Sequence, residues 1–118
     1  MFSSFRAAFR GLARTWITQR NFRFEVIVGV VTMALAFFLR VSYGEWLILI
    51  AVITAMLVLE LINTTVEFVA DLLRPRLHDA VRVMKDVASA AVLVGAFGAA
   101  VVGLMVFLPH VLRVIGNQ

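Results

Sequence analysis

The sequence predicts an all-α membrane protein, in which three transmembrane helices are preceded by an amphipathic helix on the membrane surface. The first observation is composition, because 63% of the 118 residues are hydrophobic and only 15% are charged. An average soluble domain is about 45–50% apolar and about 25% charged, and so small a domain could not cover this much apolar surface in water. The second and third observations are three long apolar stretches and a one-sided distribution of basic residues. Disorder, a nucleic-acid module and an ordinary cytosolic enzyme are excluded.

Residues 1–20 are predicted to form the surface helix. Its large apolar residues recur at three- and four-residue steps: Phe2, Phe5, Phe9, Leu12 and Trp16. These side chains share one helical face, from which Arg10 and Arg14 point away. The pattern is typical of an interfacial helix on the cytoplasmic leaflet. The alternative is an apolar stripe that packs on the helix bundle.

Three apolar stretches predict the transmembrane helices, at about residues 24–43, 46–72 and 84–108. Val87 to Leu108 carries no charge over 22 residues, which is long enough because a spanning helix needs about 20 residues. The two other charge-free stretches have 14 residues each and must extend. The first can extend to Tyr43 or back to Asn21, and the second extends into polar sequence.

Prolines and small residues add expectations for the third span. Pro75 interrupts the connection before this span, and Pro109 with Gly116 is expected to end it. Small residues repeat every four positions within it: Ala91, Gly95, Ala99 and Gly103. Such a ladder lets helix backbones approach closely in membranes, so we expect this face to pack against another helix.

The basic residues predict the orientation of the chain. Nine of the eleven lie in residues 1–25 and in the 72–86 connection, whereas only Arg40 and Arg113 lie on the other side. By the positive-inside rule, the N-terminus and this connection are expected to be cytoplasmic. The net charge of +4 favours contact with anionic lipid over DNA, and the lack of cysteine excludes disulfides and thiolate metal sites.

Polar side chains follow directly after the second apolar run: Glu60, Asn63, Thr64, Glu67 and Asp71. At about 100° per residue they fall in one narrow stripe of a helix. Ionisable groups near a bilayer are costly and are retained mostly where they face a cavity or a partner. The stripe therefore predicts a functional site, and the alternative is a helix end that has left the membrane.

A second polar group surrounds the start of the third span: Arg76, His78, Asp79, Arg82, Lys85, Asp86 and Ser89. Carboxylates can hold magnesium, and basic side chains bind phosphate oxygens. A remaining carboxylate can take a proton from an attacking hydroxyl. The two groups together predict phosphoryl transfer. His110, near the far end of the third span, is interpreted as unrelated to this chemistry.

Two segments carry specific motifs, ELINTTVE from Glu60 to Glu67 and KDVASAAV from Lys85 to Val92. They closely resemble the prokaryotic diacylglycerol kinase family, which includes the undecaprenol kinases of Gram-positive bacteria. The resemblance extends over nearly the whole chain. VSYGEW at 41–46 and GLMVFLP at 103–109 look more like the undecaprenol-kinase branch.

This resemblance implies a homotrimer of three-span subunits in the bacterial inner membrane, with the N-terminus in the cytoplasm. Active sites would lie between neighbouring subunits at the cytoplasmic face. ATP would be the phosphate donor, Mg²⁺ the cofactor and a membrane lipid alcohol the acceptor.

The same resemblance implies a role for each motif residue. Glu60 resembles the general base that acts on the lipid hydroxyl, and Asn63 resembles the group that orients the reacting centre. Glu67 resembles a magnesium ligand and nucleotide contact. The other implied nucleotide contacts are Arg76, His78, Lys85 and Asp86, and Ser89 resembles a residue near the lipid substrate.

One position departs from the family pattern. A second metal-binding glutamate belongs between the surface helix and the first span, where this chain has Gln19. Glutamine keeps a carbonyl oxygen but not the charge, so weaker magnesium binding is expected. Glu25 is the only other acid in that segment and is not an obvious replacement.

Three functions stay open at this point. The first is an ATP- and magnesium-dependent lipid kinase, with undecaprenol favoured over diacylglycerol as acceptor. The second is a non-enzymatic membrane protein such as a cation-coupled transporter subunit. The third is a degenerate kinase that acts as a scaffold, suggested by Gln19. The basic residues near Lys85 and Asp86 favour a kinase, because a transporter has no need of a phosphate-binding set.

Overall fold

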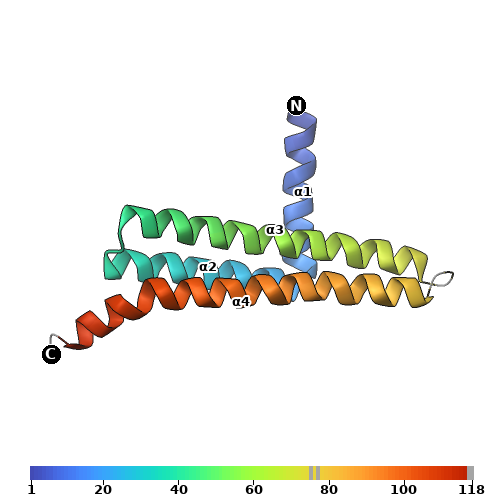
Figure 1. Cartoon of the computed structure of the whole chain (residues 1–118). Coiled ribbons are helices and arrows are strands. Elements are labelled where there is room, and N and C mark those ends of the chain that lie inside the picture. Colours follow the sequence, from blue (N-terminus) through green and yellow to red (C-terminus); the bar gives the residue numbers. More distant parts are fainter. Residues whose placement is uncertain (75, 77, 117–118) are drawn as a thin grey trace.

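The computed structural model describes residues 1–74, 76 and 78–116, and this part of the chain forms four helices. They are α1 (Phe2–Thr18), α2 (Arg20–Leu39), α3 (Tyr43–Leu73) and α4 (His78–Gly116). α2, α3 and α4 run side by side, and α1 leaves this bundle at a steep angle (Figure 1). α2, α3 and α4 are each long and apolar enough to cross a membrane. The all-helical class with three candidate spans is confirmed.

A tight turn ends α2 after Leu39. Arg40 adopts a left-handed conformation with φ 54°, and its amide and the next one donate to carbonyls of the last turn at 3.3 and 3.2 Å. This Schellman arrangement satisfies carbonyls that would otherwise lack partners. The expected continuation of the first span to residue 43 is therefore wrong. The span gains its length at the other end, because α2 begins at Arg20.

A capping box begins α3. Ser42 Oγ accepts a hydrogen bond from the Glu45 amide at 3.2 Å, and Glu45 Oε1 accepts one from the Ser42 amide at 2.9 Å. The Glu45 carboxylate also contacts α4, because His110 Nε2 lies 3.1 and 3.2 Å from its two oxygens. One side chain thus caps α3 and connects it to α4.

α4 continues through Pro109 to Gly116, so the expected helix end at this proline is wrong. Proline removes one backbone hydrogen bond and clashes with the carbonyl one turn earlier, which bends a helix without having to end it. α4 bends toward its C-terminal end (Figure 1). Gly116 is its last residue, as expected. Pro75 lies outside the described residues.

Buried apolar side chains gather around the α2–α3 turn, and we call this part of the bundle the turn end. The cluster consists of Ala36, Val41, Leu49 and Val106, with Leu39, Trp46, Val102 and Phe107 packed against it. Most other large apolar side chains are exposed. In lipid, helices associate through packing and hydrogen bonds rather than by excluding water. Among the described residues, the turn end is where buried apolar side chains form a cluster.

The small-residue ladder of α4 approaches α3 at one of its two glycines. A Cβ atom on Gly95 would lie 2.6 Å from Leu59 Cδ1 and 3.1 Å from Met56 Sδ. A Cβ atom on Gly103 would meet no atom within 4 Å. The expected close approach is therefore found at Gly95 and not at Gly103.

Gly95→Leu is expected to destabilise the bundle, because overpacking a close contact costs about 1–3 kcal/mol. Gly98→Leu is the matched control, since a Cβ atom at that position meets no atom within 4 Å. The thermal unfolding midpoint in detergent micelles, followed by circular dichroism, should fall for the first variant only. Equal midpoints for the two variants would contradict this account of the α3–α4 contact.

Candidate functional site

The polar stripe of α3 contains a deeply buried carboxyl group. Glu60 is 2% exposed and is the largest fully buried side chain of the described residues. Asn63 and Glu67, both half-buried, follow Glu60 by three and seven residues on the same face of α3. A helix end that merely faces water would not bury Glu60, so the stripe has the character of a site.

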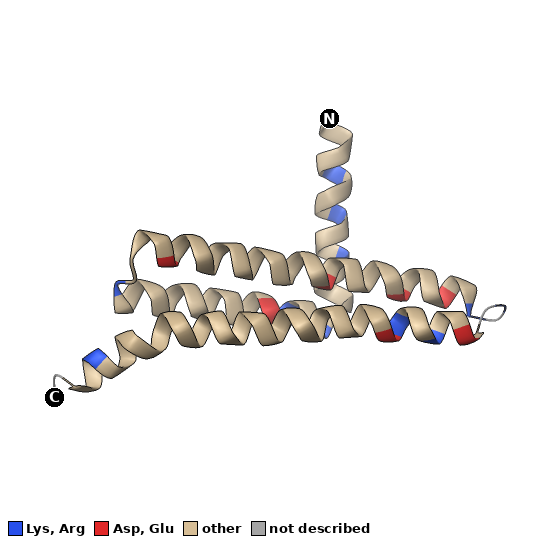
Figure 2. Cartoon of the chain, viewed as in Figure 1, with Lys and Arg blue, Asp and Glu red and all other residues tan. Residues whose placement is uncertain are grey.

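The acids of the stripe and the charged residues of early α4 lie toward the same end of the bundle. Figure 2 shows acids from the middle of α3 onward, and charged residues at the start of α4, on the side of the bundle where α3 and α4 approach their connection. We call this part of the bundle the site end. It brings the two predicted polar groups to one region of the molecule.

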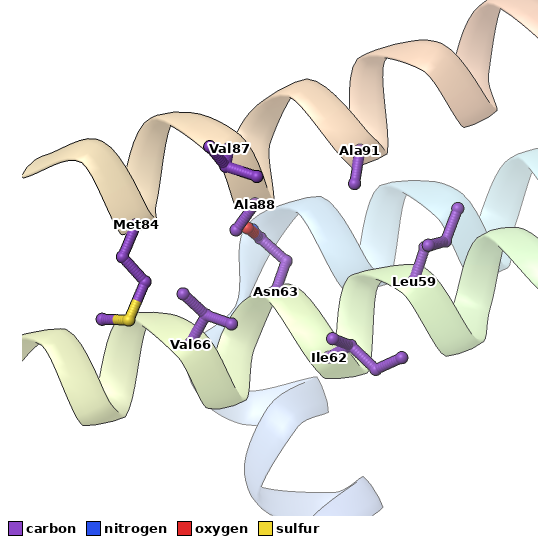
Figure 3. A pocket seen from close by; sticks show the side chains of 8 residues that line it. All are labelled: Leu59, Ile62, Asn63, Val66, Met84, Val87, Ala88 and Ala91. Carbon is purple, nitrogen blue, oxygen red and sulfur yellow. The ribbon is translucent and has the colours of Figure 1, made fainter. Parts of the chain in front are cut away.

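A groove of about 400 Å³ lies between α3 and α4 beside Asn63. The residues that line it are Leu59, Ile62, Asn63, Val66, Met84, Val87, Ala88 and Ala91. Asn63 is the single polar residue of this lining, and Figure 3 shows its amide directed toward α4 near Ala88. An apolar groove with one polar group suits a ligand with a hydrocarbon chain and a polar head.

Glu25 of α2 is a second acid near Glu60, and the sequence motifs assign it no role. Its Oε2 atom is buried without a hydrogen-bond partner among the described residues. Its carboxyl lies in the neighbourhood of Glu60. The only sequence signal was a lone acid at the start of an apolar stretch, because the proximity depends on how α2 packs against α3.

The predicted nucleotide contacts surround the start of α4. His78, Asp86 and Arg76 are exposed, and Lys85 is half-buried. The lipid-side candidate Ser89 is exposed one turn further along α4. Within the described chain no ion pair joins the side chains of this group, so their charges are available to a ligand. The structure places them in one region without bringing them into contact.

Magnesium ligands are predicted at Glu67 and Gln19. Among the described residues, no three acidic or histidine side chains form a group that could hold a metal ion. Protein sites usually bind Mg²⁺ through one or two carboxylates, and substrate phosphates and water complete the shell. Half-buried Glu67 therefore fits this chemistry by itself. Gln19 is the single residue between α1 and α2.

The chain is similar to known lipid kinases. The family described as prokaryotic diacylglycerol kinase matches residues 6–107. The undecaprenol kinase of Bacillus subtilis is 37% identical over 108 residues, which cover 92% of this chain and 88% of the relative. The diacylglycerol kinase of Synechocystis is 34% identical over 113 residues, or 95% of this chain and 65% of the relative. That of Escherichia coli is 26% identical over 103 residues, or 87% and 84%.

Proposed function

Because the chain belongs to the prokaryotic diacylglycerol kinase family, we propose that it transfers the γ-phosphate of ATP to the hydroxyl of undecaprenol. Membership of this family identifies the chain as an ATP-dependent lipid kinase with membrane-spanning helices. The hypothesis of a transporter subunit is therefore dropped. The choice of undecaprenol over diacylglycerol is supported by the similarity to the Bacillus subtilis enzyme. The VSYGEW segment at 41–46 and the GLMVFLP segment at 103–109 support the same choice.

The buried Glu60, on the same face of α3 as Asn63, is the observation that carries the proposed mechanism. Glu60 accepts the proton of the lipid hydroxyl while the hydroxyl oxygen bonds to the γ-phosphorus. The bond between the γ-phosphorus and the bridging oxygen breaks, and ADP leaves with the bonding electrons. Asn63, with its amide at the groove, orients the hydroxyl. This reaction depends mainly on positioning and on charge neutralisation.

The nucleotide is proposed to bind at the site end. Arg76, His78 and Lys85 attract its phosphate oxygens, and Asp86 accepts hydrogen bonds from it. Glu67, with Gln19, would hold Mg²⁺, which neutralises phosphate charge when bound. Ser89 lies near the lipid head group.

A homotrimer with shared active sites completes the proposal. The groove beside Asn63 is open in the single chain, and the predicted nucleotide contacts at the α3–α4 connection are exposed. A neighbouring subunit could cover both. The apolar face of α1 is exposed at Phe2, Phe5 and Phe9, which supports a helix that lies on the cytoplasmic leaflet. The positive-inside pattern supports a cytoplasmic N-terminus in a bacterial inner membrane.

The direct test is an acceptor assay with the purified protein in detergent micelles. Magnesium-ATP is supplied with undecaprenol or diacylglycerol side by side, and phosphate transfer to each lipid is measured. We expect the higher kcat/KM with undecaprenol. A preference for diacylglycerol would overturn the acceptor, and an absence of turnover with any lipid alcohol would support a degenerate kinase.

Gln19→Glu should lower the magnesium concentration for half-maximal rate by roughly threefold to tenfold, because a carboxylate binds Mg²⁺ more strongly than an amide oxygen. Asn21→Asp is the matched control, since it adds the same charge at an exposed position two residues away. The rate is measured as a function of free Mg²⁺ at saturating ATP. An unchanged midpoint for Gln19→Glu would show that position 19 does not approach the metal.

A further inference from the structure

The corner between α1 and α2 is held by one side chain. Arg23 Nη1 donates hydrogen bonds to the carbonyl oxygens of Trp16 at 2.7 Å and Ile17 at 2.9 Å. These carbonyls belong to the last turn of α1, where a helix leaves its acceptors without internal partners. A cation is favourable at a helix C-terminus, and charge-assisted hydrogen bonds are about twice as strong as neutral ones.

Few other interactions fix the position of α1 relative to the bundle. Within the described chain, these two are the only side-chain hydrogen bonds that join α1 to another helix. α1 contacts α2 more than any other helix and has little contact with α3. The direction of α1 therefore depends on the backbone of Gln19, the only residue between the two helices, and on the Arg23 contact.

The direction of α1 determines the shape of a second groove. A space of about 630 Å³ separates α1 from α3, with Gly11, Leu12 and Arg14 on one side and Leu61 and Thr64 on the other. Leu61 directly follows the proposed base Glu60 in α3. A change in the angle of α1 would alter this groove.

We propose that Arg23 is a positioning residue of the kinase, which holds α1 at the angle that keeps the α1–α3 groove open along the part of α3 that directly follows Glu60. The expected kinetic effect rests on the proposed function, whereas the role of Arg23 in fixing the angle of α1 does not depend on it. Arg23 acts here through backbone carbonyls of α1, and the basic side chains proposed to bind the nucleotide phosphates lie on α4 and the connection before it. Leu61 and Thr64, which line the α1–α3 groove, flank Asn63 of the groove proposed for the lipid. Loss of Arg23 should therefore affect use of the lipid more than use of ATP.

The kinetic test uses Arg23→Gln and the matched control Arg20→Gln. Both variants remove one positive charge near the start of α2, but Arg20 is exposed and makes no side-chain hydrogen bond among the described residues. Arg23→Gln should raise the KM for the lipid alcohol by roughly tenfold, since small misplacements in an active site have effects of this size or larger. The KM for ATP should change less, by about twofold at most, because the basic side chains proposed to bind the nucleotide phosphates lie on α4 and the connection before it. A rise in the KM for ATP instead would show that Arg23 binds nucleotide directly.

The geometric test measures the position of α1. Because the chain has no cysteine, spin labels can be attached at Ser4→Cys on α1 and Phe38→Cys on α2, both exposed positions. Labelled chains are diluted with unlabelled chains, and the label separation is measured by pulsed electron paramagnetic resonance. Arg23→Gln should shift or broaden the distance distribution, and Arg20→Gln should leave it as in the wild type. An unchanged distribution for Arg23→Gln would overturn the proposal.

A conservative variant keeps the proposal testable if Arg23→Gln does not fold. Arg23→Lys retains the charge but replaces the planar guanidinium with a compact ammonium group. It should change the same two measurements in the same direction and by less. A wild-type chain without kinase activity would overturn the proposed function, and the label distances would then still decide whether Arg23 holds α1.

Discussion

Glu60→Gln is expected to reduce the rate of lipid phosphorylation by at least about a hundredfold, because general-base catalysis typically contributes 10²–10⁴-fold. Glutamine has nearly the shape of glutamate and should fill the same buried position, but it cannot accept the proton of the attacking hydroxyl. The measurement is the initial rate at saturating ATP and lipid, with the KM for ATP determined in parallel. We expect kcat to fall and the KM for ATP to change little.

Glu45→Gln is the control for this experiment. It removes a carboxylate of the same helix at the turn end, where Glu45 contacts His110 and the α3 cap rather than the site. Its kcat should stay close to that of the wild type. A Glu60→Gln enzyme that keeps more than about a tenth of the wild-type kcat would refute the base assignment, given the contribution expected of a base. The other carboxyl beside this position, Glu25, would then be the base to examine.

Glu67→Gln is expected to lower the rate by roughly tenfold to a hundredfold at low millimolar Mg²⁺, because phosphoryl transfer depends on neutralising phosphate charge. This loss of rate is expected to depend on the Mg²⁺ concentration, unlike the loss caused by Glu60→Gln. Raising the Mg²⁺ concentration should restore part of the rate, since the amide oxygen at position 67 remains a weak ligand. The measurement is kcat as a function of free Mg²⁺ at constant magnesium-ATP.

The comparison of these two variants is itself a test of the roles. A Glu67→Gln rate that does not respond to Mg²⁺ would contradict the metal-ligand assignment. A Glu60→Gln rate that recovers with Mg²⁺ would contradict the base assignment. Glu45→Gln again serves as the control, with an unchanged Mg²⁺ midpoint.

Most of the fold could be predicted from the sequence because the governing interactions are local. The charge-free runs and the helical period predict three long helices, and the polar stripe needs only that α3 continue past Glu60. α3 does continue to Leu73. The end of α2 was missed because Arg40 adopts a left-handed conformation that is uncommon for residues other than glycine. Pro109 was misjudged because a proline can bend a helix that continues on both sides.

The contacts between helices could not be predicted from a single sequence. Glu25 lies beside Glu60 only because α2 packs against that part of α3. The pairing of His110 with Glu45 likewise depends on the packing of α4 against the start of α3. Periodicity places a residue on a helical face, but it does not say which residue of another helix that face meets. Similarly, the proximity of Arg23 to the end of α1 depends on the backbone angles of Gln19.

The buried cluster at the turn end has a mechanical consequence for an enzyme whose substrate diffuses within the membrane. α2, α3 and α4 are fastened together where Leu49 and Val106 are buried and where Glu45 contacts His110, and the described residues form no such cluster at the site end. α3 has 31 residues and is about 46 Å long at about 1.5 Å per residue. A tilt of about 5° about its fastened end moves the other end of such a helix by about 4 Å, nearly the width of a hydrocarbon chain. The side chains of α3 at the site end are therefore the ones that a small tilt of this helix displaces most.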